Sequence, residues 1–181
     1  MIHISLDLET LSTSCNATIL SLGAVRFDID KGDILEEFYY LVSMKSSMKL
    51  KFNIDPETIK WWMKQSDEAR QIFSEKGIGI NKVLTIFSEF CTEVEPSGVW
   101  GNGVVFDNGI LKNAYERCEI PLPWKYKHDR DLRTLDHLAK EMGIDWKDSD
   151  IKFEGTVHNA LDDARHQAKI ISYLWRTLKS K

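Results

Sequence analysis

The chain begins with MIHISLDLE, residues 1–9, in which apolar and polar side chains alternate without a break. One series is Ile2, Ile4, Leu6 and Leu8, and the other is His3, Ser5, Asp7 and Glu9. Successive side chains of a strand point to opposite faces, so this alternation predicts a β-strand with one apolar and one polar face. We expect the apolar face to anchor the strand in a sheet.

The polar series ends in two carboxylates, Asp7 and Glu9, which project from the same face about 7 Å apart along the strand. Each negative charge raises the pKa of the other unless a cation lies between them. Asp7 and Glu9 are therefore a candidate metal site. The alternative is that they are ordinary charges at a solvated strand end.

The length, net charge and composition of the chain limit the class of protein it can be. The chain has 181 residues and a net charge of -4, with 43% hydrophobic and 29% charged residues. This length and composition predict a single soluble domain over residues 1–181, with a core large enough to be stable without cross-links such as disulfides. A nucleic-acid binder that relies on broad electrostatics is usually basic, but an acidic enzyme that gathers metal ions can still hold a phosphate backbone.

Nothing in the sequence predicts secretion or a membrane. No apolar run approaches the ~20 residues that cross a bilayer. The first residues lack the basic and apolar regions of a signal peptide. Cys15, Cys91 and Cys118 are odd in number and have no Cys-x-x-Cys spacing, which argues for a reducing compartment and against a zinc site or a disulfide framework. We expect a cytoplasmic protein.

The remaining pattern predicts an α/β fold. Residues 17–28 and 34–42 are predicted strands that follow the first through short connections, which indicates an antiparallel meander. Further strands are expected at 99–100, buried on both faces, and within 125–131. Helices are expected to begin at residues 56, 66, 80, 106, 134 and 158. Thr134 is expected to cap the helix that begins there. The basic run 45–51 is expected to be a solvated loop. Strands that then alternate with helices predict a mixed sheet with helices on its faces.

Two later stretches place carboxylates where helices begin. Residues 99–107, VWGNGVVFD, end in Asp107, which could instead be a helix cap. Residues 158–163, HNALDD, hold His158 and the competing pair Asp162 and Asp163. Five residues turn a helix by about 140°, so His158 and Asp163 converge only if His158 lies in the loop before the helix.

In order and spacing, three motifs resemble those of the DnaQ-like 3′–5′ exonucleases of the DEDDh subclass. They are Asp7-x-Glu9, Asn102-x-x-x-Phe106-Asp107 and His158-x-x-x-x-Asp163. Trp61-Trp62 and Arg130-Asp131-Leu132-Arg133-Thr134-Leu135 resemble the branch with mycobacterial-type 3′–5′ exoribonucleases and phage exonuclease A. The family spacing selects Asp163 over Asp162, although helix geometry brings Asp162 nearer to the direction of His158.

The resemblance implies an RNase H-like fold, a mixed five-stranded sheet flanked by helices. It also implies two divalent cations, Mg²⁺ or Mn²⁺, held by Asp7, Glu9, Asp107 and Asp163, with Glu9 and His158 as catalytic residues. His158 would take a proton from the attacking water, one ion would activate that water, and the other would stabilise the leaving 3′ oxygen. The expected substrate is the 3′ end of RNA or single-stranded DNA, and the expected product is a nucleoside 5′-monophosphate.

Substrate-binding roles are expected for a wider group of residues. Thr10, Asn102, Phe106 and Asn159 occupy positions near the motifs that relatives use. Trp61 and Trp62 diverge by about 100° on a helix, so we expect one to stack on a base and one to be core, without knowing which. Arg133 and Arg130 could bind phosphate, or could form surface salt bridges.

Two other functions compete with a general exonuclease. One is a nucleic-acid-binding or regulatory module on an inactive nuclease fold, although all five motif side chains are present. The other is a processing exoribonuclease that trims 3′ overhangs of structured RNA. Some relatives pair, so a homodimer is one expected assembly, and no membrane partner is expected.

Overall fold

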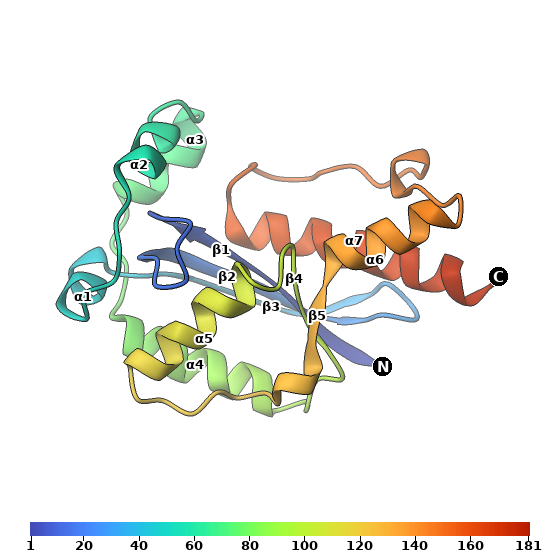
Figure 1. Cartoon of the computed structure of the whole chain (residues 1–181), viewed down its shortest axis with the longest axis horizontal. Coiled ribbons are helices and arrows are strands. Elements are labelled where there is room, and N and C mark those ends of the chain that lie inside the picture. The colour runs from blue at the N-terminus through green and yellow to red at the C-terminus, as the bar shows by residue number, and fades with distance from the viewer.

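Five strands form one mixed sheet in the computed structural model, which describes residues 1–181. The strands are β1 (Ile2–Thr10), β2 (Ile19–Asp28), β3 (Ile34–Leu41), β4 (Val99–Gly101) and β5 (Asp129–Asp131). Their order across the sheet is β3-β2-β1-β4-β5. β1 to β3 form an antiparallel meander, and β4 and β5 run parallel to β1 (Figure 1). The predicted mixed sheet is confirmed, with the opening strand at its centre.

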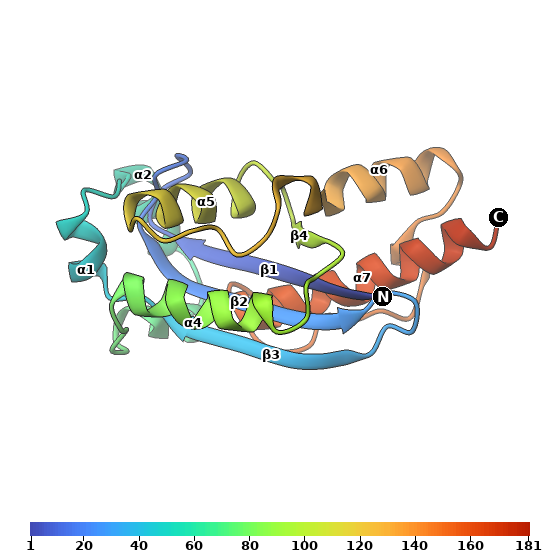
Figure 2. The same ribbon diagram turned by 90° about the horizontal axis from the view of Figure 1, so that it is seen from below.

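Helices cover both faces of the sheet. They are α1 (Met44–Lys49), α2 (Pro56–Trp62), α3 (Asp67–Arg70), α4 (Ile80–Thr92), α5 (Asp107–Arg117), α6 (Leu132–Glu141) and α7 (Ala160–Lys179). Short 3₁₀ turns lie at Gln71–Phe73, Tyr126–His128 and Trp146–Asp148. α4 and α5 pack on one face, and α6 and α7 on the other (Figure 1). α1 and α2 gather at the end of the sheet where β1 ends (Figure 2).

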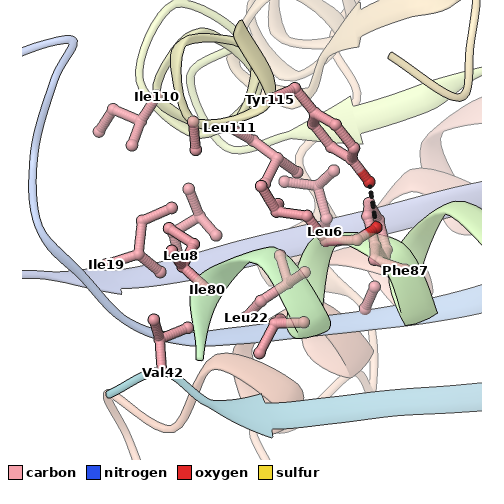
Figure 3. Packing of buried hydrophobic residues seen from close by; sticks show 14 of the residues in the cluster. Leu6, Leu8, Ile19, Leu22, Val42, Ile80, Phe87, Ile110, Leu111 and Tyr115 are labelled. Atoms are coloured by element: carbon pink, nitrogen blue, oxygen red, sulfur yellow. Dashed lines mark hydrogen bonds between the residues drawn. The ribbon is translucent and has the colours of Figure 1, made fainter. Parts of the chain in front are cut away.

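The apolar series of β1 lies at the centre of the larger core. Leu6 and Leu8 pack with Phe87 of α4 and Leu111 of α5 (Figure 3). The neighbouring Tyr115 is buried, and its hydroxyl donates a hydrogen bond of 2.9 Å to the backbone oxygen of Leu84. A buried tyrosine hydroxyl without a partner would be costly, so this bond is part of why the ring is tolerated there. The sheet is thereby fixed against α4 and α5.

The polar series of β1 is also covered, because α7 packs over it. Ser5 is fully buried, and the side chain of His3 accepts a hydrogen bond of 2.9 Å from Trp100 Nε1. Opposite His3 and Ser5, β2 places Phe27 and Val25, which belong to the core under α7. The strand is therefore buried on both faces, and a solvated strand end does not describe its polar residues.

Two local expectations are wrong. The basic run 45–51 is not a plain loop, because the short helix α1 occupies most of it. α6 begins earlier than expected and is capped by Asp131 rather than Thr134, whose backbone N–H and hydroxyl both donate to Asp131 Oδ1. A carboxylate at the junction of β5 and α6 accepts both bonds at once, which explains its use as the cap. No helix combines the length and the apolar character that a membrane crossing requires.

Candidate active site

A cavity of about 690 Å³ opens where β1 ends, α5 begins and α7 begins. It is lined by side chains from segments more than a hundred residues apart in sequence. The predicted site residues in its walls are Asp7, Glu9, Thr10, Trp61, Asn102, Phe106, Asp107, Arg133, His158 and Asp163. The structure therefore brings the five motif side chains into one place.

Four carboxylates converge on this cavity from three elements. Asp7 and Glu9 come from β1, Asp107 is the first residue of α5, and Asp163 lies in the first turn of α7. Ligand atoms of Glu9, Asp163 and His158 all lie within 4.8 Å of one another. Glu9 is only 6% exposed and Asp107 only 2% exposed. Groups so placed lose much of the hydration that stabilises their charge.

The pKa values of all four carboxyls are raised. Burial, with Asp163 and Asp107 nearby, raises the pKa of Glu9 to about 9. Burial raises the pKa of Asp107 to about 7 and that of Asp163 to about 6, and the pKa of Asp7 lies well above its ordinary value for the same reason. Arg133 is the cation that opposes this effect at Asp107. The cationic side chains around the four carboxylates therefore do not balance their negative charge.

This donor set fits hard divalent cations. Mg²⁺, Mn²⁺ and Ca²⁺ prefer carboxylate oxygens, and a cation among clustered carboxylates offsets the repulsion that raises their pKa values. A zinc site would instead favour histidine and cysteine ligands, and no cysteine lines the cavity. Asp7, Glu9, Asp107 and Asp163 are the residues that would hold such ions.

Asp107 depends on a glycine in the preceding strand. A Cβ at Gly101 would lie 2.6 Å from Asn108 Oδ1 and 2.9 Å from Asp107 Cβ, so a larger residue would displace the start of α5. The nearby backbone N–H groups of Asn102 and Leu8 lower the pKa of Asp107, against the larger effect of burial. The N-terminus of α5 has no side-chain cap, so Asp107 does not serve as one.

His158 lies just before α7, as helix geometry required. Its φ of 66° is left-handed, which is uncommon for a residue with a side chain. Its backbone N–H donates a hydrogen bond of 2.9 Å to Asp163 Oδ2, and its ring meets Trp61 edge to face at 4.8 Å between centroids. Burial lowers the pKa of His158, so the imidazole is neutral near pH 7 and able to accept a proton.

The two tryptophans have different roles. Trp62 is 1% exposed, and its Nε1 donates a 2.8 Å hydrogen bond to the backbone oxygen of Thr10, so its ring is core and cannot stack on a base. Trp61 is 41% exposed and lines the cavity. Trp62 is therefore the core tryptophan of the pair, and the stacking of Trp61 on a base stays a prediction.

Two other expected residues lie elsewhere. The side chain of Asn159 caps α7 by accepting from the backbone N–H groups of Leu161 and Asp162, and it is absent from the cavity wall. The cap uses the amide oxygen alone, and a contact between Asn159 and substrate stays a prediction. Arg130 donates to the backbone oxygens of Lys127 and Asp129, away from the cavity, whereas Arg133 lines it.

Gln167 is a site residue that the sequence reasoning missed. It is buried, lines the cavity, and its Nε2 donates a 2.8 Å hydrogen bond to Asp7 Oδ1. Its position four residues after Asp163 puts it on the same face of α7, and that spacing was the available signal. Gln167 thereby ties the helix that carries Asp163 to the strand that carries Asp7.

Gly23 lets α7 approach the sheet. It pairs with Asp7 across β1 and β2, and a Cβ at this position would lie 2.1 Å from the backbone carbon of Ala160. Ordinary contact requires at least about 3.4 Å, so α7 would have to move by more than about 1 Å.

We expect Gly23→Ala to lower the free energy of unfolding by about 1–3 kcal/mol through overpacking, and to displace Asp163. Urea unfolding followed by tryptophan fluorescence measures this change. Gly109→Ala in α5 is the control, because a Cβ there meets only the backbone oxygen of Val104 at 3.8 Å. Alanine in a helix interior should make that variant slightly more stable. Equal stability of Gly23→Ala and the unmodified chain would contradict the close approach.

Comparisons with known proteins show the family and the fold of the chain. The family model described as the Rv2179c-like 3′–5′ exoribonuclease domain matches residues 2–175. An exodeoxyribonuclease of Enterobacteria phage T4 is 25% identical over 163 residues, covering 74% of this chain and 70% of that protein.

Solved structures show the same fold at low identity. E. coli exonuclease I in complex with a dT13 oligonucleotide is 17% identical with a TM-score of 0.68, over 99% of this chain and 42% of that one. The nuclease domain of 3′hExo, a DEDDh family member bound to rAMP, is 15% identical with a TM-score of 0.60, over 97% and 92%. The chain thus spans less than half of exonuclease I. These likenesses confirm the RNase H-like fold.

Proposed function

The chain belongs to the Rv2179c-like 3′–5′ exoribonuclease domain family, and on that premise we propose that it hydrolyses nucleic acids from the 3′ end with two divalent cations. The observation that carries the proposal is the convergence of Asp7, Glu9, Asp107, Asp163 and His158 on one cavity. An inactive binding module would have no need to keep five such costly polar groups together.

The four carboxylates would hold Mg²⁺ or Mn²⁺. Such ions, when bound, supply Lewis-acid stabilisation of charge on the reacting phosphate and ready a water for attack. The buried positions of Glu9 and Asp107 give the carboxylates little freedom to follow a moving ligand. The protein therefore contributes a fixed cage, which limits the reorganisation needed during the reaction.

His158 would accept the proton of the attacking water. Its imidazole stands beside Glu9 and Asp163 and is neutral near pH 7 because burial lowers its pKa. A base with a pKa near or below the working pH is free to accept that proton. Arg133, in the same wall, is placed to pair with a phosphate of the substrate.

We propose RNA as the preferred substrate, with single-stranded DNA as a second. The family description favours RNA, and the phage relative is named for DNA. Matched 5′-labelled RNA, DNA and 3′-overhang duplexes, offered with Mg²⁺ or Mn²⁺, test the choice. Faster shortening of single-stranded RNA supports it. Trimming restricted to overhangs would instead indicate a processing enzyme, and binding without shortening would indicate a binding module.

Trp61 is proposed to stack on a base of the bound strand. Base–aromatic stacking is worth about 1–3 kcal/mol, so Trp61→Ala should raise KM by about 5- to 150-fold. Steady-state kinetics on a short oligonucleotide measure this change. Trp61→Phe, which keeps an aromatic face, should recover most of the affinity. An unchanged KM in Trp61→Ala would exclude the stacking role.

The cellular setting is also a proposal. Cys15, Cys91 and Cys118 are all free, which suits a reducing compartment such as the cytoplasm. Pairing into a homodimer is proposed from the family resemblance, and sedimentation velocity at micromolar concentration tests it. One boundary near 21 kDa would exclude the dimer.

A further inference from the structure

Two adjacent carboxylates at the start of α7 contact different parts of the protein. Asp163 faces the cavity and accepts the backbone N–H of His158. Asp162 points away from the cavity, and its Oδ2 accepts a 2.9 Å hydrogen bond from the backbone N–H of Thr156. Neighbouring residues on a helix differ in direction by about 100°, so one helical turn can serve both sites.

The carboxylate of Asp162 is also held by a salt bridge. Arg165, one turn along α7, donates through NH1 to Asp162 Oδ1. The same guanidinium binds Glu37 of β3 through two hydrogen bonds, of 2.7 Å from Nε and 2.6 Å from NH2. Two parallel bonds between a guanidinium and a carboxylate fix both orientation and distance. The carboxylate of Asp162 is therefore oriented by the sheet as well as by its own helix.

The loop before α7 is shaped around this carboxylate. Gly155 has a φ of 104°, a conformation that favours glycine, and a Cβ there would lie 2.3 Å from Asp162 Cγ. Three residues later His158 is held in a left-handed conformation, which costs energy for a residue with a side chain. Such a conformation persists only when surrounding contacts impose it. Asp163 accepts from the backbone N–H of His158 itself, and Asp162 accepts from that of Thr156, two residues earlier.

We propose that Asp162 is a positioning residue for His158: it holds the 155–158 loop so that the imidazole reaches the cavity. This inference rests on the proposed exonuclease function, in which His158 is the base. Asp163 would hold metal and Asp162 would hold the base, so the two adjacent carboxylates are not interchangeable. A misplacement of about 1 Å in a reacting group can cost about 100-fold in rate.

The kinetic test compares Asp162→Ala with Glu154→Ala. Glu154 is 77% exposed and joins the same loop to α7 through Lys169, so its loss removes an equal charge from a solvated contact. We expect Asp162→Ala to lower kcat by about 10- to 100-fold with unchanged KM and unchanged Mn²⁺ affinity in calorimetry. Glu154→Ala should keep wild-type kinetics. Wild-type kcat in Asp162→Ala, or weaker Mn²⁺ binding, would overturn the proposal.

A double-mutant cycle isolates the route through His158. In a His158→Ala background, Asp162→Ala should lower kcat by no more than about twofold, since the group it positions is gone. An undiminished further loss would overturn the proposal. If thermal melting shows that Asp162→Ala is unfolded, Asp162→Leu, which is similar in size but cannot accept from the backbone N–H of Thr156, replaces it in the same cycle.

A readout without activity separates this inference from the proposed function. The rings of His158 and Trp61 are close enough, at 4.8 Å between centroids, to give a nuclear Overhauser contact. That contact should be present in the unmodified chain and in Glu154→Ala, and lost in Asp162→Ala. Its persistence in Asp162→Ala would overturn the positioning role. An inactive wild type with the expected pattern of contacts would contradict the exonuclease proposal alone.

Discussion

Asp7→Asn is expected to lower the rate of 3′ shortening by about 10³-fold or more while making the metal-free protein more stable. Removing a charged ligand weakens the stabilisation that bound cations give to the transition state, which is worth several kcal/mol. The asparagine keeps the size of the side chain and an oxygen that can still accept from Gln167 Nε2. The loss of rate is therefore due to the charge rather than to a collapsed site.

The gain in stability has a separate cause. The pKa of Asp7 is raised well above its ordinary value, first by burial and then by Asp107, Glu9 and Asp163. Each unit by which folding raises a carboxyl pKa costs about 1.4 kcal/mol of stability once the group is ionised. A neutral amide avoids this cost. A substitution that removes activity and raises the melting temperature identifies a site whose charged side chains lower the stability of the fold.

Degradation kinetics and thermal melting in EDTA measure the two effects. Ser5→Ala is the matched control, two residues earlier on the same face of β1. Its hydroxyl is buried without a hydrogen-bond partner, so alanine should cost little and leave the rate unchanged. Wild-type activity in Asp7→Asn would remove Asp7 from the proposed metal cage.

The second large effect is a pH-dependent stabilisation by divalent cations. Asp163, Asp107 and Glu9 have folded-state pKa values of about 6, 7 and 9, above the ordinary values near 4. The folded protein therefore binds more protons than the unfolded chain from about pH 4 to pH 9, and its stability falls as pH rises through that window. The stability that these carboxyls provide is fully present below pH 4 and is lost stepwise as each one ionises.

Cations that bind the ionised cluster should reverse this loss. We expect millimolar Mn²⁺ to raise the melting temperature by several degrees at pH 8 and by much less at pH 5, where protons compete for the same oxygens. Differential scanning fluorimetry at both pH values, with and without EDTA, measures the difference. Asp107→Asn should reduce the pH 8 effect, and a cation effect equal at both pH values would argue against binding to these carboxylates.

The sequence predicted the strand and the helix that carry this site, because the signals for these elements are local. Alternation over residues 1–9 indicated a strand, and the spacing from His158 to Asp163 required a loop followed by a helix. What the sequence could not supply is contact between distant segments. The polar face of β1 is buried only because α7, more than 150 residues later, packs on it through the space left at Gly23.

The same limit explains the wrong cap and the alternative that helix geometry had left open. Thr134 is a good capping residue by type, but the turn from β5 places Asp131 ahead of it. Helix geometry ranked Asp162 close to His158, yet its carboxylate bonds to Thr156 and Arg165 instead. Both outcomes depend on which partner the tertiary fold brings within hydrogen-bond distance, and residue type alone carries no such information.

The most direct test is to incubate the purified chain with a 5′-labelled single-stranded oligoribonucleotide, with Mg²⁺ or Mn²⁺ and with EDTA. A cluster of four carboxylates beside a neutral histidine predicts a ladder of labelled products that shortens from the 3′ end, with nucleoside 5′-monophosphates released and no reaction in EDTA. Absence of degradation with either metal, or release of the label in the first product, would contradict a metal-dependent 3′–5′ exonuclease.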